Sequence, residues 1–270
     1  MDRGCKFGTL RMNIIAYADD IVLIADAKGN LDVLYEALKA KFQECKLNIN
    51  KKKTKCIIFK RKGRPDRLEK LTLAGDELDV VSEYKYLGHH LQSNLSDIKD
   101  IEVRLNAFYA KSNWVLRNFN NVNIETLLYL FNAYCTPDYG LSLWDAGSIF
   151  CKQIFKTFET AYSNALKRII GVPISTSSHA VADCCNKLLL MPHVLLNQAR
   201  YFKRLNHVTN SVIRMSHGLS KNGYLFNSMY DYFKEIYSID FASNSMDIIK
   251  ASLQWVHRQA VHTGWELSVG

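Results

Sequence analysis

The chain has 270 residues, of which 48% are hydrophobic and 23% charged, and this ordinary globular composition excludes a disordered or fibrous protein. Its length can bury a sizeable core and predicts two structural units. Its net charge of +9 indicates an anionic partner such as nucleic acid.

The first predicted elements are two short strands, residues 13–17 and 21–25, on either side of Asp19 and Asp20. Both segments are apolar, rich in β-branched residues and uninterrupted, which predicts buried strands. Adjacent carboxylates repel each other, and a divalent cation such as Mg²⁺ removes that penalty. The pattern therefore predicts a hairpin with two aspartates in its turn and a metal site at its tip.

A helix is predicted next, followed by further strands. Apolar residues recur at helical spacing over residues 31–45, so this helix should lie against a sheet. Residues 56–59 predict a strand, and residues 71–73 and 78–80 predict a hairpin around Gly75-Asp76. The segment Tyr84-Lys85-Tyr86-Leu87-Gly88 ends the strand-rich part.

The positive charge is concentrated in one segment of this strand-rich part. Residues 41–70 contain twelve Lys/Arg and three Asp/Glu, a local net charge of +9, so the rest of the chain sums to zero. This segment includes the cluster Lys51, Lys52, Lys53 and Lys55 and the basic loop with Lys60, Arg61, Lys62 and Arg64. A nucleic-acid backbone would be attracted without sequence readout; the alternative is a solvated helix end and loop.

Helices are predicted from about residue 96 onward. Apolar stripes and breakers indicate helices over residues 124–135, 149–170, 181–187, 193–207, 224–237 and 246–262, after a first helix with the stripe Ile101, Leu105, Phe108, Ser112, Val115 and Phe119. Tyr109, Trp114, Tyr139 and Trp144 are interpreted as packing or core residues rather than stacking platforms. The fold class is thus α+β, with antiparallel strands and one packed helix, followed by an all-α region.

Cysteine usage and the chain ends indicate the compartment. Seven cysteines without a C-x-x-C pair favour a reducing environment. The spacing of His179, Cys184, Cys185 and His193 matches no common zinc pattern, which favours buried thiols and surface histidines. No secretion signal or membrane-length apolar run is recognised. We expect a soluble intracellular protein, in the cytoplasm or nucleus, without a membrane partner.

Three motifs, in the same order along the chain, resemble those of reverse transcriptases. The residues of each motif are most similar to those of non-LTR (LINE-type) retrotransposon polymerases. Tyr17-Ala18-Asp19-Asp20 between two strands resembles the active-site hairpin. Residues 47–59 resemble the next motif of that family, a loop and a strand that carry a lysine. Tyr84–Gly88 resembles the hairpin that grips the primer at the palm–thumb junction. More loosely, Thr136-Pro137, Tyr139-Gly140, Trp144 and residues 166–171 are similar to the thumb of those elements.

The resemblance implies the domains and the roles of residues. Residues 1–93 would be the C-terminal part of a palm, 94–175 a helical thumb and 176–270 a helical extension. Asp19 and Asp20 would bind Mg²⁺, of which the intact family site holds two ions, with Tyr17 and Ala18 beside the primer end. Lys53 would donate a proton to the leaving pyrophosphate, with Lys52 and Lys55 as rivals. Residues implied in contacts with the RNA template and DNA primer are Lys51, Lys52, Lys55, Lys60, Arg61, Lys62, Arg64, Tyr86, Leu87, Gly88, Lys99, Arg104 and Lys111, with Arg117 on the same helix.

The resemblance also implies segments that precede this hairpin by more than sixteen residues. They carry a third aspartate on an earlier strand, the fingers that bind the dNTP, and a glycine motif for the template. Asp26 and Asp32 are too near Asp20 to replace the third aspartate. We expect a truncated polymerase that has no activity by itself. We also expect its sheet to have an exposed apolar edge. The alternatives are a non-enzymatic nucleic-acid-binding remnant and a helical interaction protein with an accidental Asp-Asp pair.

Overall fold

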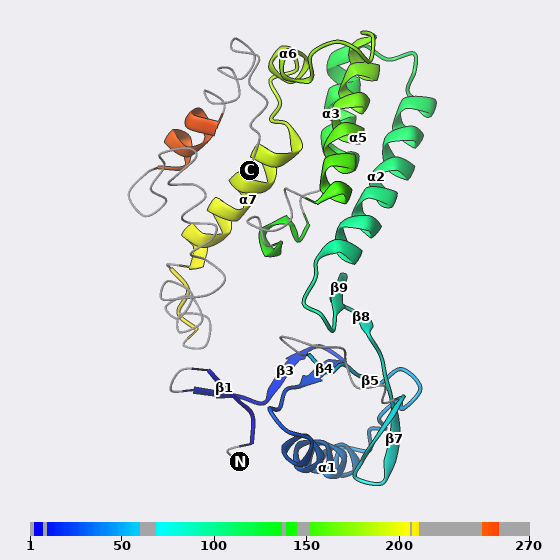
Figure 1. Ribbon diagram of the computed structural model, residues 1–270, viewed down its shortest axis with the longest axis vertical. Helices are drawn as coiled ribbons and strands as arrows, with labels where there is room; N and C mark the ends of the chain where they lie inside the picture. Colours follow the sequence, from blue (N-terminus) through cyan, green and yellow to red (C-terminus); the bar gives the residue numbers. More distant parts are fainter. Residues whose placement is uncertain are drawn as a thin grey trace. The chain divides into compact units, whose positions relative to one another are not determined.

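A computed structural model describes residues 3–7, 10–59, 69–136, 139–144, 152–205, 207–210 and 245–253. Contacts divide the chain into two compact units, with a boundary between Ser96 and Asp97. The first unit mixes strands with one helix, and the second is helical in its described part (Figure 1). The sequence changes character from strand-rich to helical near the same point.

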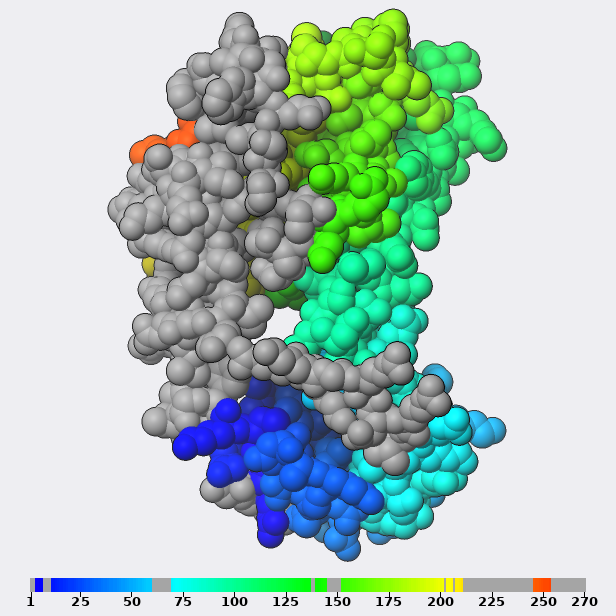
Figure 2. Space-filling view, viewed as in Figure 1, coloured from blue at the N-terminus to red at the C-terminus, as the bar shows by residue number. Residues whose placement is uncertain are grey.

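The first unit contains short strands in four separate small sheets. Its elements are β1 (Cys5–Phe7), β2 (Leu10–Met12), β3 (Ile14–Tyr17), β4 (Asp20–Leu23), α1 (Lys28–Glu44), β5 (Lys55–Cys56), β6 (Lys70–Leu73), β7 (Asp76–Val80), β8 (Glu83–Tyr86) and β9 (His89–Gln92). The pairs β1–β2, β3–β4, β6–β7 and β8–β9 are antiparallel hairpins, and β5 adds to β7 in parallel. Figure 2 shows the surface of this unit in blue to cyan.

Helix α1 packs against the hairpin β6–β7, as the sequence predicts for a helix against a sheet. The buried residues of this core are Tyr35 on α1, Leu73 on β6 and Leu78 on β7. Leu71 and Cys56 pack around them and are partly buried. Apolar burial is thus modest in the described part of this unit, so polar contacts have a larger share in its stability.

Two of the hairpins turn over two residues that both have positive φ. The φ values are 44° and 78° at Ala74-Gly75, and 45° and 82° at Leu87-Gly88. Positive φ at both central residues is the mark of a type I′ turn, which suits the twist of the flanking strands. The predicted hairpin around residue 75 is confirmed, although Asp76 begins β7 rather than lying in the turn.

The second unit is a set of helices around one large core. Its labelled elements are α2 (Ile98–Asn118), α3 (Ile124–Cys135), the short 3-10 helix η1 (Leu141–Leu143), α5 (Gln153–Ile170), α6 (Ser178–Cys184) and α7 (Leu190–Leu205). Residues 246–253 are also helical. Buried residues from all these helices belong to one cluster, so the predicted boundary at residue 175 does not separate two cores.

Four aromatic rings from three helices fill the centre of this core. Phe108 of α2 lies 5.4 Å from Phe158, 5.9 Å from Tyr162 and 6.0 Å from Phe131, measured between ring centroids. The angles between these rings are tilted or edge-on, which is the favoured arrangement for aromatic pairs. The predicted stripe of α2 is confirmed, because Ile101, Phe108 and its other members through Val115 are buried.

A buried polar network joins α2, η1 and α7. The Trp144 indole Nε1 donates to the Asp100 carboxylate at 2.9 Å, and Gln198 Nε2 donates to the Trp144 carbonyl at 2.7 Å. Trp144 is therefore a core residue, as predicted. Tyr139 is not, because 59% of its surface is exposed and its ring instead lies 5.0 Å below the Arg104 guanidinium.

Other element boundaries differ from the sequence expectations. The strand predicted at residues 56–59 contains only Lys55–Cys56, because β5 pairs with just two residues of β7. Helix α5 ends where predicted, at Gly171, whose φ of 77° suits glycine and whose N–H bonds to the Lys167 carbonyl. The helix predicted at residues 224–237 lies outside the described residues. Among the described helices, none combines the length and apolarity needed to cross a membrane.

We expect Phe158→Ala to destabilise the helical unit by about 3–5 kcal/mol, because it removes a fully buried ring from the aromatic centre. The measurement is urea unfolding followed by tryptophan fluorescence, since all four tryptophans follow residue 96. Tyr129→Ala is the control, because Tyr129 is 72% exposed and its removal should change stability by less than about 0.5 kcal/mol. Equal effects of the two changes would contradict the assigned core.

Candidate functional site

The two adjacent aspartates lie at the tip of the hairpin β3–β4. Tyr17 pairs with Asp20, and Ala18-Asp19 form the two-residue turn. The predicted hairpin is confirmed, but only Asp19 is in the turn, because Asp20 already pairs as the first residue of β4. Both aspartates are exposed, and neither carboxylate has a hydrogen-bond or ion-pair partner among the described residues.

The turn holds an alanine in a conformation that favours glycine. Ala18 has a φ of 52°, and a positive φ at the first central residue is the feature of a type II′ turn, where glycine is usual. An L-residue in the left-handed region costs roughly 1–2 kcal/mol. Five other described non-glycine residues also have positive φ, among them Ala74 and Leu87 in the turns above, so the tip is a candidate site on residue type and exposure rather than on backbone conformation.

Strand β3 is more exposed than the sequence suggests. Ile14, Ile15 and Tyr17 are exposed to 47%, 39% and 66%, so the prediction of a buried strand is wrong for β3. Among the described strands β3 pairs only with β4, which leaves its other edge open. A two-stranded hairpin is marginally stable alone, and an open apolar edge is a place where another strand can pair.

The carboxylates at the tip are hard oxygen donors, which is what Mg²⁺ prefers. In the described part of the chain, no group of three or more His, Cys, Asp and Glu residues could hold a metal ion. Two nearby acidic residues make contacts elsewhere. The Asn30 side chain donates to Asp26 and lowers the pKa of that carboxyl, and Asp32 accepts the Ala74 N–H at 2.7 Å.

The predicted lysine cluster forms a turn after α1. The Lys53 and Thr54 N–H groups donate to the Asn50 carbonyl, at 3.1 and 2.9 Å. The ammonium groups of this cluster fall into two classes. Lys51 and Lys55 form ion pairs with Asp76 and Asp79, while Lys52 and Lys53 have no side-chain partner among the described residues.

The hairpin β8–β9 contacts this lysine turn. The Tyr84 hydroxyl donates to the Lys53 carbonyl at 3.2 Å. This bond joins residues 47–59 to Tyr84–Gly88, two of the segments that resemble reverse transcriptase motifs. The Tyr86 hydroxyl on the same strand is buried and has no hydrogen-bond partner in the described part of the chain. Leu87 and Gly88 form the turn. The structure thus brings the predicted primer hairpin to the lysine turn.

A buried aspartate that was not predicted from the sequence holds the lysine turn in place. Asp76 is 6% exposed and pairs with the ammonium groups of Lys51 at 2.5 Å and Lys39 at 2.9 Å. The Tyr35 hydroxyl donates to the same carboxylate at 3.2 Å. Hydrogen bonds from Lys51 and then Lys39 lower the pKa of Asp76 to about 2, and burial raises the pKa of Tyr35 to about 12.

Two weak sequence signals point to this network. Asp32, Tyr35 and Lys39 recur at helical spacing and therefore share the face of α1 that meets the Ala74-Gly75 turn and Asp76. The sequence analysis instead interpreted Asp76 as a turn residue. A buried role could have been inferred from the apolar residues on alternate positions of β7, since Asp76 shares the face of buried Leu78.

The predicted nucleic-acid contacts of the helical unit differ in their surroundings. Lys99 pairs with Glu102 at 3.5 Å, and Arg104 is held between Asp100 and the Tyr139 ring. Lys111 is exposed and has no side-chain partner among the described residues. The predicted contacts Lys60, Arg61, Lys62 and Arg64 lie outside the described residues.

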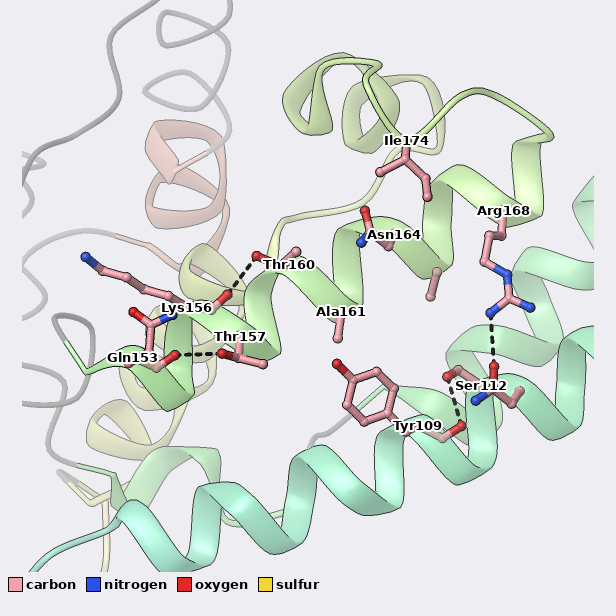
Figure 3. A pocket seen from close by; sticks show the side chains of 12 residues that line it. Tyr109, Ser112, Gln153, Lys156, Thr157, Thr160, Ala161, Asn164, Arg168 and Ile174 are labelled. Carbon is pink, nitrogen blue, oxygen red and sulfur yellow. Dashed lines mark hydrogen bonds between the residues drawn. The ribbon is translucent and has the colours of Figure 1, made fainter.

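A polar groove of about 530 Å³ lies between α2 and α5 (Figure 3). Tyr109 of α2 points toward Ala161 of α5 across it, and Arg168 donates to Asn113 at 3.0 Å at one end. Thr157 and Thr160 line its wall but donate to the carbonyl four residues earlier in their own helix. The hydroxyl donors of Thr157 and Thr160 are therefore already used within α5.

We expect Asp76→Asn to loosen the attachment of the lysine turn and of α1 to β6–β7, because it removes the charge that pairs with Lys39 and Lys51. The pKa of Asp76 in the fold, about 2, is below the unfolded value of about 3.9, so its contribution is present above about pH 4 and disappears as the pH falls through about 2. Hydrogen exchange of the β6–β7 amides measures this change.

Asp79→Asn is the matched control for this change. Asp79 lies on the same strand but is 51% exposed, and exposed ion pairs contribute only about 0–1 kcal/mol. Asp76→Asn should accelerate exchange clearly more than Asp79→Asn at neutral pH, and the two variants should converge near pH 2. Equal exchange rates in the two variants at neutral pH would contradict the role assigned to Asp76.

Comparison with known proteins supports the relationship suggested by the motifs. Residues 3–91 match the family model described as reverse transcriptase (RNA-dependent DNA polymerase). A putative uncharacterized transposon-derived protein of Caenorhabditis elegans is 26% identical over 165 residues, which cover 60% of this chain and 57% of that protein. The first unit is thus related in sequence to reverse transcriptases, in a chain that is similar to a transposon-derived protein.

Proposed function

We propose that this chain carries the end of the palm and the thumb of an RNA-directed DNA polymerase from a non-LTR retrotransposon. The observation that carries the proposal is the hairpin tip with Asp19 and Asp20, within the segment that matches the reverse transcriptase family. The exposure of both carboxylates, which have no hydrogen-bond or ion-pair partner among the described residues, supports a role in binding rather than in folding.

In this proposal Asp19 and Asp20 hold Mg²⁺, with Asp19 the chief ligand and Asp20 a weaker or indirect one. When bound, the metal ions of such a site stabilise the attacking and leaving oxygens of phosphoryl transfer. Tyr17 and Ala18 lie beside the carboxylates on the hairpin and would contact the primer end. The positive charge of the chain suits the phosphates of an RNA template, a DNA primer and a dNTP.

The lysine turn would approach the triphosphate of the incoming nucleotide. Lys53 would donate a proton to the leaving pyrophosphate, a role that requires an ammonium within hydrogen-bond reach. Ion pairing of Lys55 with Asp79 makes Lys55 the weaker rival, while Lys52 is as available as Lys53. The bond from Tyr84 to the Lys53 carbonyl would couple this turn to the hairpin β8–β9, which would grip the primer.

The described residues contribute only part of such a site. Two carboxylates lie at the tip, and a site of this family needs a third on a neighbouring strand. The open edge of β3 is where such a strand could pair, because its backbone groups and the side chains of Ile14 and Ile15 are available. We therefore propose that the 270-residue chain alone does not synthesise DNA.

A second candidate function is nucleic-acid binding without catalysis. It is favoured by Lys52, Lys53 and Lys111, whose charges have no partner among the described residues. Such cations attract phosphates whatever the state of the metal site, and their attraction depends on salt. RNA binding with no synthesis even after a polypeptide with a third strand-borne aspartate is added would support this function, and Asp19-dependent synthesis with that polypeptide would support the first.

Primer extension on an RNA template with Mg²⁺ or Mn²⁺ tests the polymerase proposal. We expect no extension by the 270-residue chain above that of Asp19→Asn. Extension that disappears in Asp19→Asn would show a complete site and contradict the proposed inactivity. Restored extension on adding a polypeptide that supplies a third strand-borne aspartate, again dependent on Asp19, would support the metal-binding role directly.

Salt dependence of binding to an RNA–DNA duplex tests the lysine turn. The logarithm of the binding constant falls linearly with the logarithm of the salt concentration. Removing one cation that binds a phosphate makes this slope less steep by roughly 0.7–0.9, so the double variant Lys52→Gln with Lys53→Gln should make it less steep by about 1.4–1.8. Lys70→Gln is the control, because Lys70 is neutralised by Glu77 at 2.7 Å. An unchanged slope in the double variant would exclude Lys52 and Lys53 from the binding surface.

A further inference from the structure

An exposed aromatic cluster lies on the helical unit where α2 meets α3. Trp114 of α2 is 52% exposed, and its ring centroid lies 6.1 Å from Tyr134 of α3 and 5.6 Å from Phe119. Phe119 packs against the core, and Tyr134 is itself 52% exposed. The indole therefore contacts two other rings while about half of the Trp114 surface faces solvent.

The charges around this cluster are positive. Lys111 and Arg117 lie one turn before and one turn after Trp114 on α2, so the three side chains share one side of the helix. Both cations are exposed, and neither has an ion-pair partner among the described residues. From residue 105 to the end of α3, Glu125 is the one acidic residue in the sequence, and it lies at the opposite end of α3 from Tyr134.

We propose that Trp114 is a stacking platform for a base of single-stranded RNA, with Lys111 and Arg117 contacting the phosphates on either side. Aromatic rings beside unpaired cations are the usual means of holding single strands, since every base has a π-face. Exposed Asn120 and Asn121 follow α2 and offer amide groups for base edges and 2′-hydroxyls. The choice of RNA over DNA rests on the proposed function.

Rigidity distinguishes this cluster from a scatter of exposed apolar residues, which is normal on proteins. The rings of Phe119 and Tyr134 meet Trp114 at 73° and 59°, so neither ring is stacked parallel to the indole. The Asn118 amide also donates to the Trp114 carbonyl at 2.8 Å, which closes the last turn of α2. A fixed indole loses little conformational entropy on binding a base.

The test is equilibrium binding of a labelled single-stranded RNA of about 12 nucleotides, within the range of known single-strand sites, to the 270-residue chain. Trp114→Leu keeps apolar bulk and removes the π-face, and should weaken binding about 5- to 150-fold. Tyr129→Ala is the matched control, because this tyrosine of α3 is 72% exposed and contacts no other described ring; binding should not change.

A second arm measures the phosphate contacts. Lys111→Gln with Arg117→Gln should lower the slope of log K against log salt by about 1.4, since each single-strand contact contributes roughly 0.7. Trp114→Leu should weaken the affinity without changing this slope. A Trp114→Leu chain that binds RNA as tightly as the parent would overturn the proposal, and so would a slope unaffected by the double variant.

Two further outcomes would assign the cluster to another partner. Single-stranded DNA bound as tightly as RNA, with the same dependence on Trp114, would overturn the choice of RNA. Unchanged RNA binding together with conversion of an oligomer to a monomer in Trp114→Leu would make the cluster a contact between copies of the chain. Binding is measured in EDTA without divalent cations, so a loss of RNA binding cannot result from a change at the metal site. Primer extension tests the metal site separately.

Discussion

The buried carboxylate of Asp76 is the contact on which the first unit depends. A charge with 6% exposure is tolerated only when it is paired, and here it pairs with an ammonium from α1 and another from the lysine turn. Tyr35 adds a hydrogen bond. Because the apolar core beside it is small, these directional contacts place α1 and the lysine turn against β6–β7.

The same unit leaves its candidate chemistry exposed. Asp19 and Asp20 lie at the tip of a hairpin whose strand β3 bears exposed isoleucines and pairs, among the described strands, with β4 alone. Carboxylates that no other described residue binds are available to a cation, and an apolar edge that no described strand covers is available to another strand. The helical unit has the opposite character, with one large core around Phe108 and its neighbouring rings.

Periodicity predicted the helical unit well. The bounds of α3 agree with the predicted 124–135, and the stripe of α2 is buried from Ile101 to Val115. Long amphipathic segments carry many residues that agree with one period, so their signal is strong. The strands were less predictable. Residues 56–59 are apolar enough for a strand, but the length of β5 is set by the number of residues that pair with β7.

The sequence by itself determined the positions of most helices and hairpins, the relationship to reverse transcriptases, and the aspartates and lysines that are candidates for chemistry. These properties follow from local spacing and residue type. Only the tertiary structure decided which charges are available: Lys51 and Lys55 are paired while Lys52 and Lys53 have no side-chain partner among the described residues. It also showed that β3 is exposed and Asp76 buried, since burial and pairing depend on residues distant in the sequence.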